Sequence, residues 1–318
     1  MWSLLKRRNF ISGFSRNYGT KIGFIGVGNM GSRMAQNLLK KNESLIIYDT
    51  QAQNLEPFEN RPNAKIAGSV KELADESNCV ITMLPNNDSV LSVYTENDGI
   101  LNNCGQKNAI FIDCSTIDPG VSQKLFSLCE QKNFSFLDAP VSGGVVGAEN
   151  ASLTFMVGGC ELTTKVIEPL LLKMGSKVTY CGAPGSGQVV KLCNNLLLSS
   201  SMIAVAESMN IGLKFGLDAK LLASVINSSS GRCWSSDTYN PVPGVFDNVP
   251  ASHNYQGGFK TTFLLKDVKL ALDLAERTNS STPLAKITQE IYLKAASKGY
   301  EDSDFSVIYK YLSENVED

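Results

Sequence analysis

The feature that most constrains this chain is a glycine-rich turn near the N-terminus, set between an apolar run and a helical pattern. Gly26, Gly28 and Gly31 form the pattern Gly-x-Gly-x-x-Gly. The apolar run 21–27 is typical of a buried parallel strand, and the spacing of the apolar residues after the turn predicts a helix. A further apolar run at 45–48 completes a strand–helix–strand unit. In this context the turn predicts a dinucleotide-binding site.

Each residue of this turn is expected to have a different role in binding a dinucleotide. Gly26 permits the tight turn, Gly28 lets the backbone approach the pyrophosphate, and Gly31 lets the helix pack closely on the strand. Asn29 and Met30 belong to the start of the helix, where free N–H groups and a partial positive charge attract phosphate. A glycine turn that binds nothing is the alternative.

Asp49 follows the second strand near the spacing at which an acidic residue binds ribose. Its carboxylate can accept hydrogen bonds from both hydroxyls of the adenosine ribose, and it repels a 2′-phosphate. The next residues are Thr50 and Gln51, so no arginine follows directly. The sequence therefore predicts NAD rather than NADP, with a solvated turn aspartate as the alternative.

Apolar runs and helical patterns alternate along the first part of the chain. Further strands are predicted at 79–83, 109–112, 135–137, 153–157 and 177–180, and helices at 119–132 and 161–174. This alternation predicts an α/β fold, with a doubly wound Rossmann-type domain over residues 21–184. Later helical patterns, at 189–215, 218–226, 263–278 and 283–297, predict an all-α domain over residues 185–318. The stretch 228–259 is rich in Gly, Ser, Asn and Pro and is predicted to be irregular, with room for short helices.

Composition excludes several classes of function. The chain is 43% hydrophobic and 19% charged with a net charge of −2, so it has no global basic field to hold nucleic acid. No uncharged apolar run approaches the ~20 residues of a membrane span. The eight cysteines never occur as Cys-x-x-Cys and there is one histidine, so no zinc or other metal site is predicted.

The first twenty residues differ in composition from the rest. They contain basic, hydroxylated and apolar residues, and no acidic residue occurs before Glu43. This pattern is typical of a mitochondrial transit peptide over residues 1–20 and predicts a location in the matrix. A frayed basic N-terminus is the alternative.

Lys191 and Asn195 lie four residues apart on a predicted helix and therefore share a face. Leucines flank them, which predicts a helix buried on most sides and a cleft for Lys191. A solvent-exposed pair is the alternative, since lysine is mostly a surface residue. Asn194 points about 100° away on an ideal helix and ranks below Asn195.

A compact polar turn is formed by Ser142, Gly143 and Gly144. The serine hydroxyl and the backbone N–H groups of the two glycines could hold a carboxylate without a cationic side chain. A turn that merely joins two elements is the alternative.

Four ordered segments between residues 21 and 312 give the chain a family resemblance. They are 23–31 (GFIGVGNMG), 138–144 (DAPVSGG), 185–195 (GSGQVVKLCNN) and 263–268 (FLLKDV). They resemble the cofactor, substrate, catalytic and cofactor-closing signatures of the β-hydroxyacid dehydrogenases, and most closely those of the 3-hydroxyisobutyrate dehydrogenases. The segment 229–244 is similar to the mitochondrial branch, which acts in valine breakdown.

This resemblance implies an NAD-dependent oxidation of a small 3-hydroxy acid, with Lys191 and Asn195 as the catalytic residues. Lys191 would hydrogen-bond the substrate hydroxyl, either as general base or as the holder of the developing alkoxide, and Asn195 would orient the lysine or the hydroxyl. The turn at 142–144 would bind the substrate.

The resemblance also places further cofactor residues. Leu84 and Pro85 would pack near the adenosine, Thr116 would lie near the nicotinamide, and Lys266 would close over the cofactor. Trp234 and Phe259 are expected in the substrate pocket or, equally, in the core.

Two other functions stay open. One is a related acid reductase of the tartronate semialdehyde reductase type, against which the segment 232–244 argues. The other is a dinucleotide-binding module without catalysis, against which the presence of Lys191 argues. The long apolar helix predicts a homodimer or a higher homo-oligomer.

Overall fold

The structure is a computed structural model and describes residues 21–314; the predicted transit peptide lies outside the described residues. The chain divides into two compact units, one ending at Lys191 and the other beginning at Leu192. This division falls inside α10 (Ser186–Lys214). The domain boundary between residues 184 and 185 stays a prediction.

The first unit is built on one sheet, whose strand order is β3-β2-β1-β4-β5-β6-β8-β7, with β9 paired to β8. Its strands are β1 (Ile22–Ile25), β2 (Leu45–Tyr48), β3 (Ala64–Ile66), β4 (Cys79–Thr82), β5 (Ile110–Asp113), β6 (Ser135–Asp138), β7 (Val141–Ser142), β8 (Leu153–Gly158) and β9 (Gly175–Gly182). The strands from β3 to β6 are parallel, whereas β8 runs antiparallel to β6 and β7. The strand order reverses between β1 and β4, which is where ligands bind in sheets of this kind.

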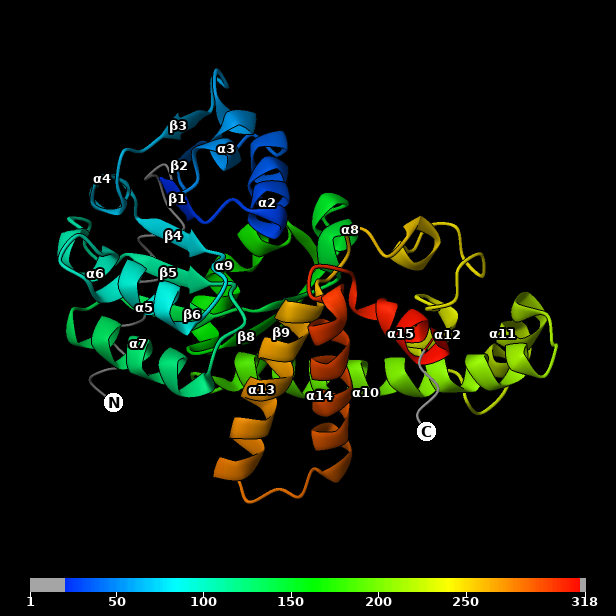
Figure 1. Ribbon diagram of the computed structural model, residues 1–318. Coiled ribbons are helices and arrows are strands. Elements are labelled where there is room, and N and C mark those ends of the chain that lie inside the picture. Colours follow the sequence, from blue (N-terminus) through cyan, green and yellow to red (C-terminus); the bar gives the residue numbers. More distant parts are fainter. Residues whose placement is uncertain (1–20, 315–318) are drawn as a thin grey trace. The chain divides into compact units, whose positions relative to one another are not determined.

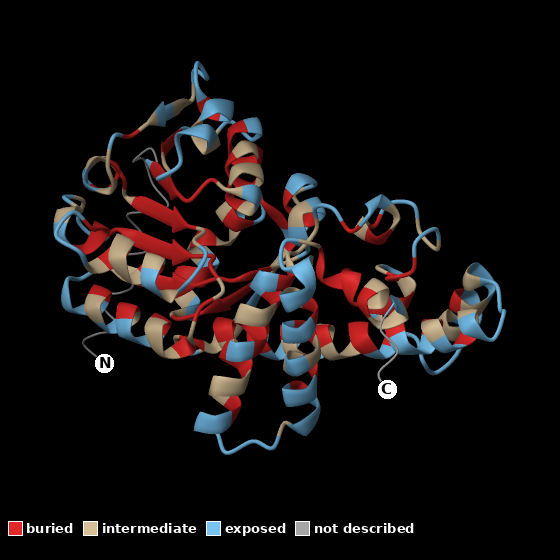
Figure 2. Cartoon of the chain, in the orientation of Figure 1, coloured by how far each residue is buried: buried red, intermediate tan, exposed pale blue. Residues whose placement is uncertain are grey.

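The central strands are buried on both faces, as their unbroken apolar sequences require. Phe24 and Ile112 contribute to the core on one face, and Ile25 and Phe111 to the core on the other. Figure 2 shows β4 and β5 coloured as buried. Alternate side chains therefore anchor helices on opposite sides of the sheet.

Two sets of helices cover these faces (Figure 1). The first core includes side chains of α2 (Asn29–Lys40), α8 (Gly144–Glu149) and α9 (Glu161–Leu171). The second includes side chains of α4 (Val70–Glu76), α5 (Asn87–Thr95), α6 (Ile100–Asn103) and α7 (Pro119–Gln131). The short α3 (Ala52–Leu55) follows β2.

The second unit is helical. Besides α10 it contains α11 (Ala219–Asn227), α12 (Trp234–Asp237), α13 (Thr261–Arg277), α14 (Pro283–Ala295) and α15 (Ile308–Glu314). Met202 of α10, Leu264 of α13 and Tyr292 of α14 are fully buried in one core. The prediction of an α/β Rossmann-type domain followed by a helical domain is confirmed.

By length and composition α10 could also cross a membrane: an 18-residue window of it has a mean hydropathy of 1.5, and 44% of that window is buried inside the protein. A core helix passes the same test. The burial of Met202, Ala206 and Met209 against other helices supports that assignment.

Several short elements were not among the predicted segments, and two of them are strands. β3 and β7 have only three and two residues, too few for a period of two to show. The stretch 228–259 contains α12 and a 3₁₀ turn at Pro250–His253, as its composition allowed.

Candidate active site

The glycine turn has the geometry that a dinucleotide requires. Gly26 has φ +88°, and a Cβ there would lie 2.3 Å from the carbonyl oxygen of Met83. A Cβ on Gly31 would lie 1.9 Å from the carbonyl oxygen of Gly26, so α2 packs directly on the turn. By contrast, a Cβ on Gly28 would meet no described atom within 4 Å. This position borders open space that a pyrophosphate can occupy.

The start of α2 leaves its backbone donors available to an anion. Gly28 is the N-cap, and it has no side chain that could accept from Asn29, Met30 or the next residue. The first turn contains no acidic residue. The donors and the helix dipole therefore favour a phosphate at this end of α2.

Asp49 lies beside this turn, directly after β2. Its Oδ2 accepts a hydrogen bond of 2.8 Å from the backbone N–H of Val27. Its Oδ1 accepts from the backbone N–H of Gln51 at 2.8 Å and from the side-chain amide of Asn54 at 3.1 Å. These bonds fix the carboxylate next to the phosphate turn, where it can receive ribose hydroxyls.

The loops after β4 and β5 are tied to each other. The backbone N–H of Leu84, which precedes Pro85, donates to Ser115 Oγ at 2.8 Å. Ser115 Oγ in turn donates to Asp113 Oδ1 at 2.6 Å, and Asp113 also accepts from Thr82 Oγ1 at 2.7 Å. Asp113 is fully buried, and this burial raises the pKa of its carboxyl to about 6. The loops that carry the predicted cofactor residues Leu84, Pro85 and Thr116 thus rest on one buried polar network.

The predicted substrate turn begins in the sheet. Ser142 is the last residue of β7 and is half-buried, and α8 starts at Gly144. The φ angles of Gly143 and Gly144 are +135° and +61°, which other residues rarely adopt. Both glycines are exposed, so their backbone N–H groups can be reached by a small carboxylate.

Lys191 and Asn195 lie one turn apart on α10, and both are buried, with 9% and 1% of their surfaces exposed. One face of α10 is open, because Val190 and Leu197 are 41% and 71% exposed and Cys193 and Asn194 are exposed beside them. Asn194 is exposed, and its side chain donates to Asn195 Oδ1 at 3.1 Å. The helix therefore buries the face that carries the lysine.

Asp267 is a residue to which the sequence assigned no role. Within the second unit, Asn195 Nδ2 donates to Asp267 Oδ2 at 2.6 Å, and Lys266 Nζ lies 3.0 Å from Asp267 Oδ1. Asp267 is 2% exposed. One buried carboxylate thus orients Asn195 and holds Lys266. The only sign of Asp267 in the sequence was its position next to Lys266 in the segment 263–268, which resembles a family signature.

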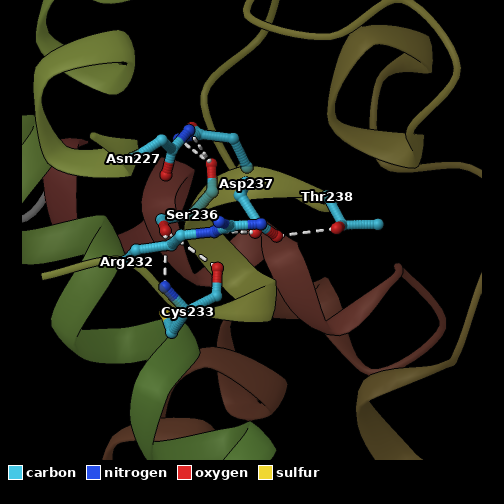
Figure 3. A network of polar contacts seen from close by, with 7 residues as sticks. Asn227, Arg232, Cys233, Ser236, Asp237 and Thr238 are labelled. Atoms are coloured by element: carbon cyan, nitrogen blue, oxygen red, sulfur yellow. Dashed lines mark hydrogen bonds and ion pairs between the residues drawn. The ribbon is translucent and has the colours of Figure 1, made fainter. Parts of the chain in front are cut away.

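The segment 229–244, which narrowed the family resemblance, is held by its own polar contacts (Figure 3). Arg232 Nε donates to Asp237 Oδ2 at 2.7 Å, and the backbone N–H of Cys233 donates to Ser236 Oγ at 2.9 Å. The hydroxyl of Thr238, followed by the Arg232 guanidinium, holds the pKa of Asp237 below its usual range. The guanidinium is therefore engaged within the segment.

The two aromatic residues expected in the substrate pocket or, equally, in the core differ in burial. Trp234 is 46% exposed and stacks on Tyr239 with ring centroids 4.7 Å apart. Phe259 is half-buried and contacts Phe305 edge-on, with ring centroids 6.1 Å apart. Trp234 is thus the one more open to a ligand, and the pocket role of both stays a prediction.

Comparison with known proteins covers both units. Residues 21–182 match the profile of the NAD binding domain of 6-phosphogluconate dehydrogenase, and residues 185–312 match that of the NAD-binding domain of NADP-dependent 3-hydroxyisobutyrate dehydrogenase. The mitochondrial 3-hydroxyisobutyrate dehydrogenase of Rattus norvegicus is 50% identical over 93% of this chain and 88% of its own length. The chain belongs to the 3-hydroxyisobutyrate dehydrogenase family.

Other members of this family agree. The mitochondrial 3-hydroxyisobutyrate dehydrogenase of Homo sapiens is 48% identical over 93% of this chain and 87% of its own length. The solved structure of the Mycobacterium tuberculosis 3-hydroxyisobutyrate dehydrogenase with L-serine has a TM-score of 0.85 and 37% identity, covering 93% of this chain and 99% of that one. The predictions of an NAD-dependent oxidoreductase and of a mitochondrial location are confirmed.

Proposed function

We propose that the protein oxidises 3-hydroxyisobutyrate to methylmalonate semialdehyde in valine catabolism, with NAD as cofactor and Lys191 as the residue that manages the hydroxyl proton. NAD, when bound, accepts the hydride from the carbon that carries the hydroxyl. The observation that carries the proposal is a lysine buried to 9% exposure on α10, in a chain with an open glycine turn and a ribose-binding aspartate.

The reaction removes a hydride from carbon and a proton from oxygen. The amino group of Lys191 either takes that proton or stabilises the alkoxide as the hydride leaves. Asn195, oriented by Asp267, supplies an amide that holds the lysine or the hydroxyl. The substrate carboxylate would be bound by Ser142 and by the backbone of Gly143 and Gly144, which offer neutral donors at a turn open to solvent.

The test is the production of NADH by the purified full chain. (S)-3-hydroxyisobutyrate, glycerate and 3-hydroxypropionate are compared, each with NAD and with NADP. Lys191→Ala is expected to lower kcat about 10²- to 10⁴-fold, the usual contribution of a positioned acid or base. Lys214→Ala is the matched control, because Lys214 is an exposed lysine at the end of the same helix.

Each outcome separates the candidate functions. Turnover of 3-hydroxyisobutyrate with NAD, lost in Lys191→Ala and kept in Lys214→Ala, supports the proposal. Turnover of glycerate alone would show that the proposed substrate is wrong and would favour the function of a tartronate semialdehyde reductase. NAD binding without turnover of any substrate identifies a non-catalytic dinucleotide-binding module.

We also propose that the protein is a homodimer or a higher homo-oligomer. Ile211 near the end of α10 and Phe215 in the turn after it are 73% and 86% exposed, and Leu221 and Val225 on α11 are 57% and 53% exposed. Four large apolar side chains exposed within one helix–turn–helix segment are costly in water. Light scattering at micromolar concentration tests the proposal, and the 34.4 kDa mass of one chain would contradict it.

A further inference from the structure

Gln188 is fully buried in the first turn of α10, and both ends of its side-chain amide are engaged. Its Nε2 donates to the carbonyl oxygen of Ser115 at 2.8 Å, and its Oε1 accepts from the backbone N–H of Ile117 at 3.1 Å. These two bonds lie on either side of Thr116 in the loop after β5. One amide therefore fixes the backbone of the residue expected at the nicotinamide.

The same turn of α10 is anchored to the sheet by Asp138, the last residue of β6. Asp138 Oδ1 accepts from the backbone N–H of Gly185 at 2.8 Å, and Oδ2 accepts from that of Gln188 at 3.1 Å. A Cβ on Gly187 would lie 2.2 Å from the carbonyl oxygen of Met156 and 2.8 Å from Asp138 Oδ2. The start of α10 is thus in direct contact with β6 and β8 and has no room to shift toward them.

Lys191 follows Gln188 by three residues, less than one helical turn, so the two side chains lie on neighbouring parts of one helix face. All the contacts that fix Gln188 belong to the first unit. Gln188 is bound to the loop 115–117, and a rigid helical turn connects Gln188 to Lys191. Together they determine the position of Lys191 relative to that loop.

We propose that Gln188 is a positioning residue that sets the separation between Lys191 and the nicotinamide-binding loop 115–117, and with it the alignment of the substrate for hydride transfer. This inference rests on the proposed function of Lys191 and adds a residue that touches neither substrate nor cofactor. Alignment errors of about 1 Å can lower a reaction rate about 10²-fold, so one buried amide in this place has a large effect on the chemical step.

The test compares the full chain with Gln188→Met, which keeps the length of the side chain and removes both hydrogen bonds. The matched control is Asn63→Leu. Asn63 also uses a side-chain amide to hold backbone, donating to the carbonyl oxygens of Leu39 and Glu43 at 3.2 and 2.9 Å. These contacts lie at the start of β3, an edge strand that β2, β1 and β4 separate from β5, after which the loop 115–117 follows.

Two measurements read the effect. The first is amide hydrogen exchange of residues 115–117 without substrate, which is expected to become at least about tenfold faster in Gln188→Met because Ile117 N–H loses its acceptor. The second is the primary deuterium isotope effect on kcat with substrate labelled at the hydroxyl-bearing carbon. We expect kcat to fall about 10- to 100-fold and the isotope effect to rise toward its intrinsic value, with KM changed less than about threefold. Asn63→Leu should leave all of these unchanged.

Unchanged kcat and isotope effect in Gln188→Met would overturn the inference even if exchange becomes faster. An equal loss of kcat in both variants, tracking their thermal stability, would also overturn it, because the role would then be structural alone. If the unaltered chain fails to oxidise 3-hydroxyisobutyrate, the proposed function fails separately. If another hydroxy acid is turned over, the kinetic measurements use that substrate. If none is turned over, unchanged hydrogen exchange at Ile117 in Gln188→Met overturns the inference.

Discussion

Replacing Gly28 with alanine should separate cofactor binding from folding. Gly28 is the N-cap of α2 with φ −67° and ψ −156°, a conformation that alanine also adopts, and the added methyl group would meet no described atom within 4 Å. Alanine restricts the unfolded chain and so stabilises the folded state by about 0.4–1 kcal/mol, whereas the poorer N-cap destabilises the folded state by a similar amount. The free energy of unfolding should therefore change by less than about 1 kcal/mol.

NAD binding should weaken strongly in the same variant. The methyl group occupies the space through which a pyrophosphate approaches the backbone N–H groups of α2. Loss of one hydrogen bond to a charged phosphate costs about 1.5–3 kcal/mol, which corresponds to a dissociation constant about 10- to 150-fold higher. Calorimetric titration with NAD gives the affinity, and thermal unfolding without NAD gives the stability.

Gly31→Ala is the matched control, since its methyl group would lie 1.9 Å from the carbonyl oxygen of Gly26. This overlap should destabilise the fold by about 1–3 kcal/mol or more. Wild-type affinity for NAD in Gly28→Ala would refute the assignment of the open space to the pyrophosphate. A large loss of stability in Gly28→Ala would refute the conclusion that a methyl group fits at this position without steric overlap.

Three further changes test other parts of the site. Asp49→Asn should lower the preference for NAD over NADP about tenfold in kcat/KM, because the repulsion of a 2′-phosphate is removed while Val27 N–H keeps an acceptor; an unchanged ratio would contradict this. Burial raises the pKa of Asp113 from 3.8 to about 6, so its ionisation destabilises the folded state as pH rises through this range. Relative to wild type, Asp113→Asn should therefore gain up to about 3 kcal/mol in free energy of unfolding between about pH 4 and pH 7, and parallel curves in urea unfolding would refute it. Asp267→Ala should lower kcat about tenfold with a smaller effect on NAD affinity, because Asn195 loses its buried acceptor; unchanged kcat in steady-state assays would exclude the role.

The sequence alone determined the parts of the protein that depend on local backbone requirements. The glycine turn and Asp49 could be placed because a strand, a tight turn and a helix start each demand particular residues at fixed spacing. The shared face of Lys191 and Asn195 follows from the helical period alone. The long helices were predicted within a few residues of α10, α13 and α14 for the same reason.

Only the tertiary structure decided which distant residues support these groups. Asp267 lies 72 residues from Asn195, and Ser115 lies 73 residues from Gln188, yet each pair is joined by a hydrogen bond. Periodicity describes which face a residue occupies and carries no information about its partner on another element. The short strands β3 and β7 were likewise decided by pairing with neighbours, because two or three residues are too few to show a pattern of their own.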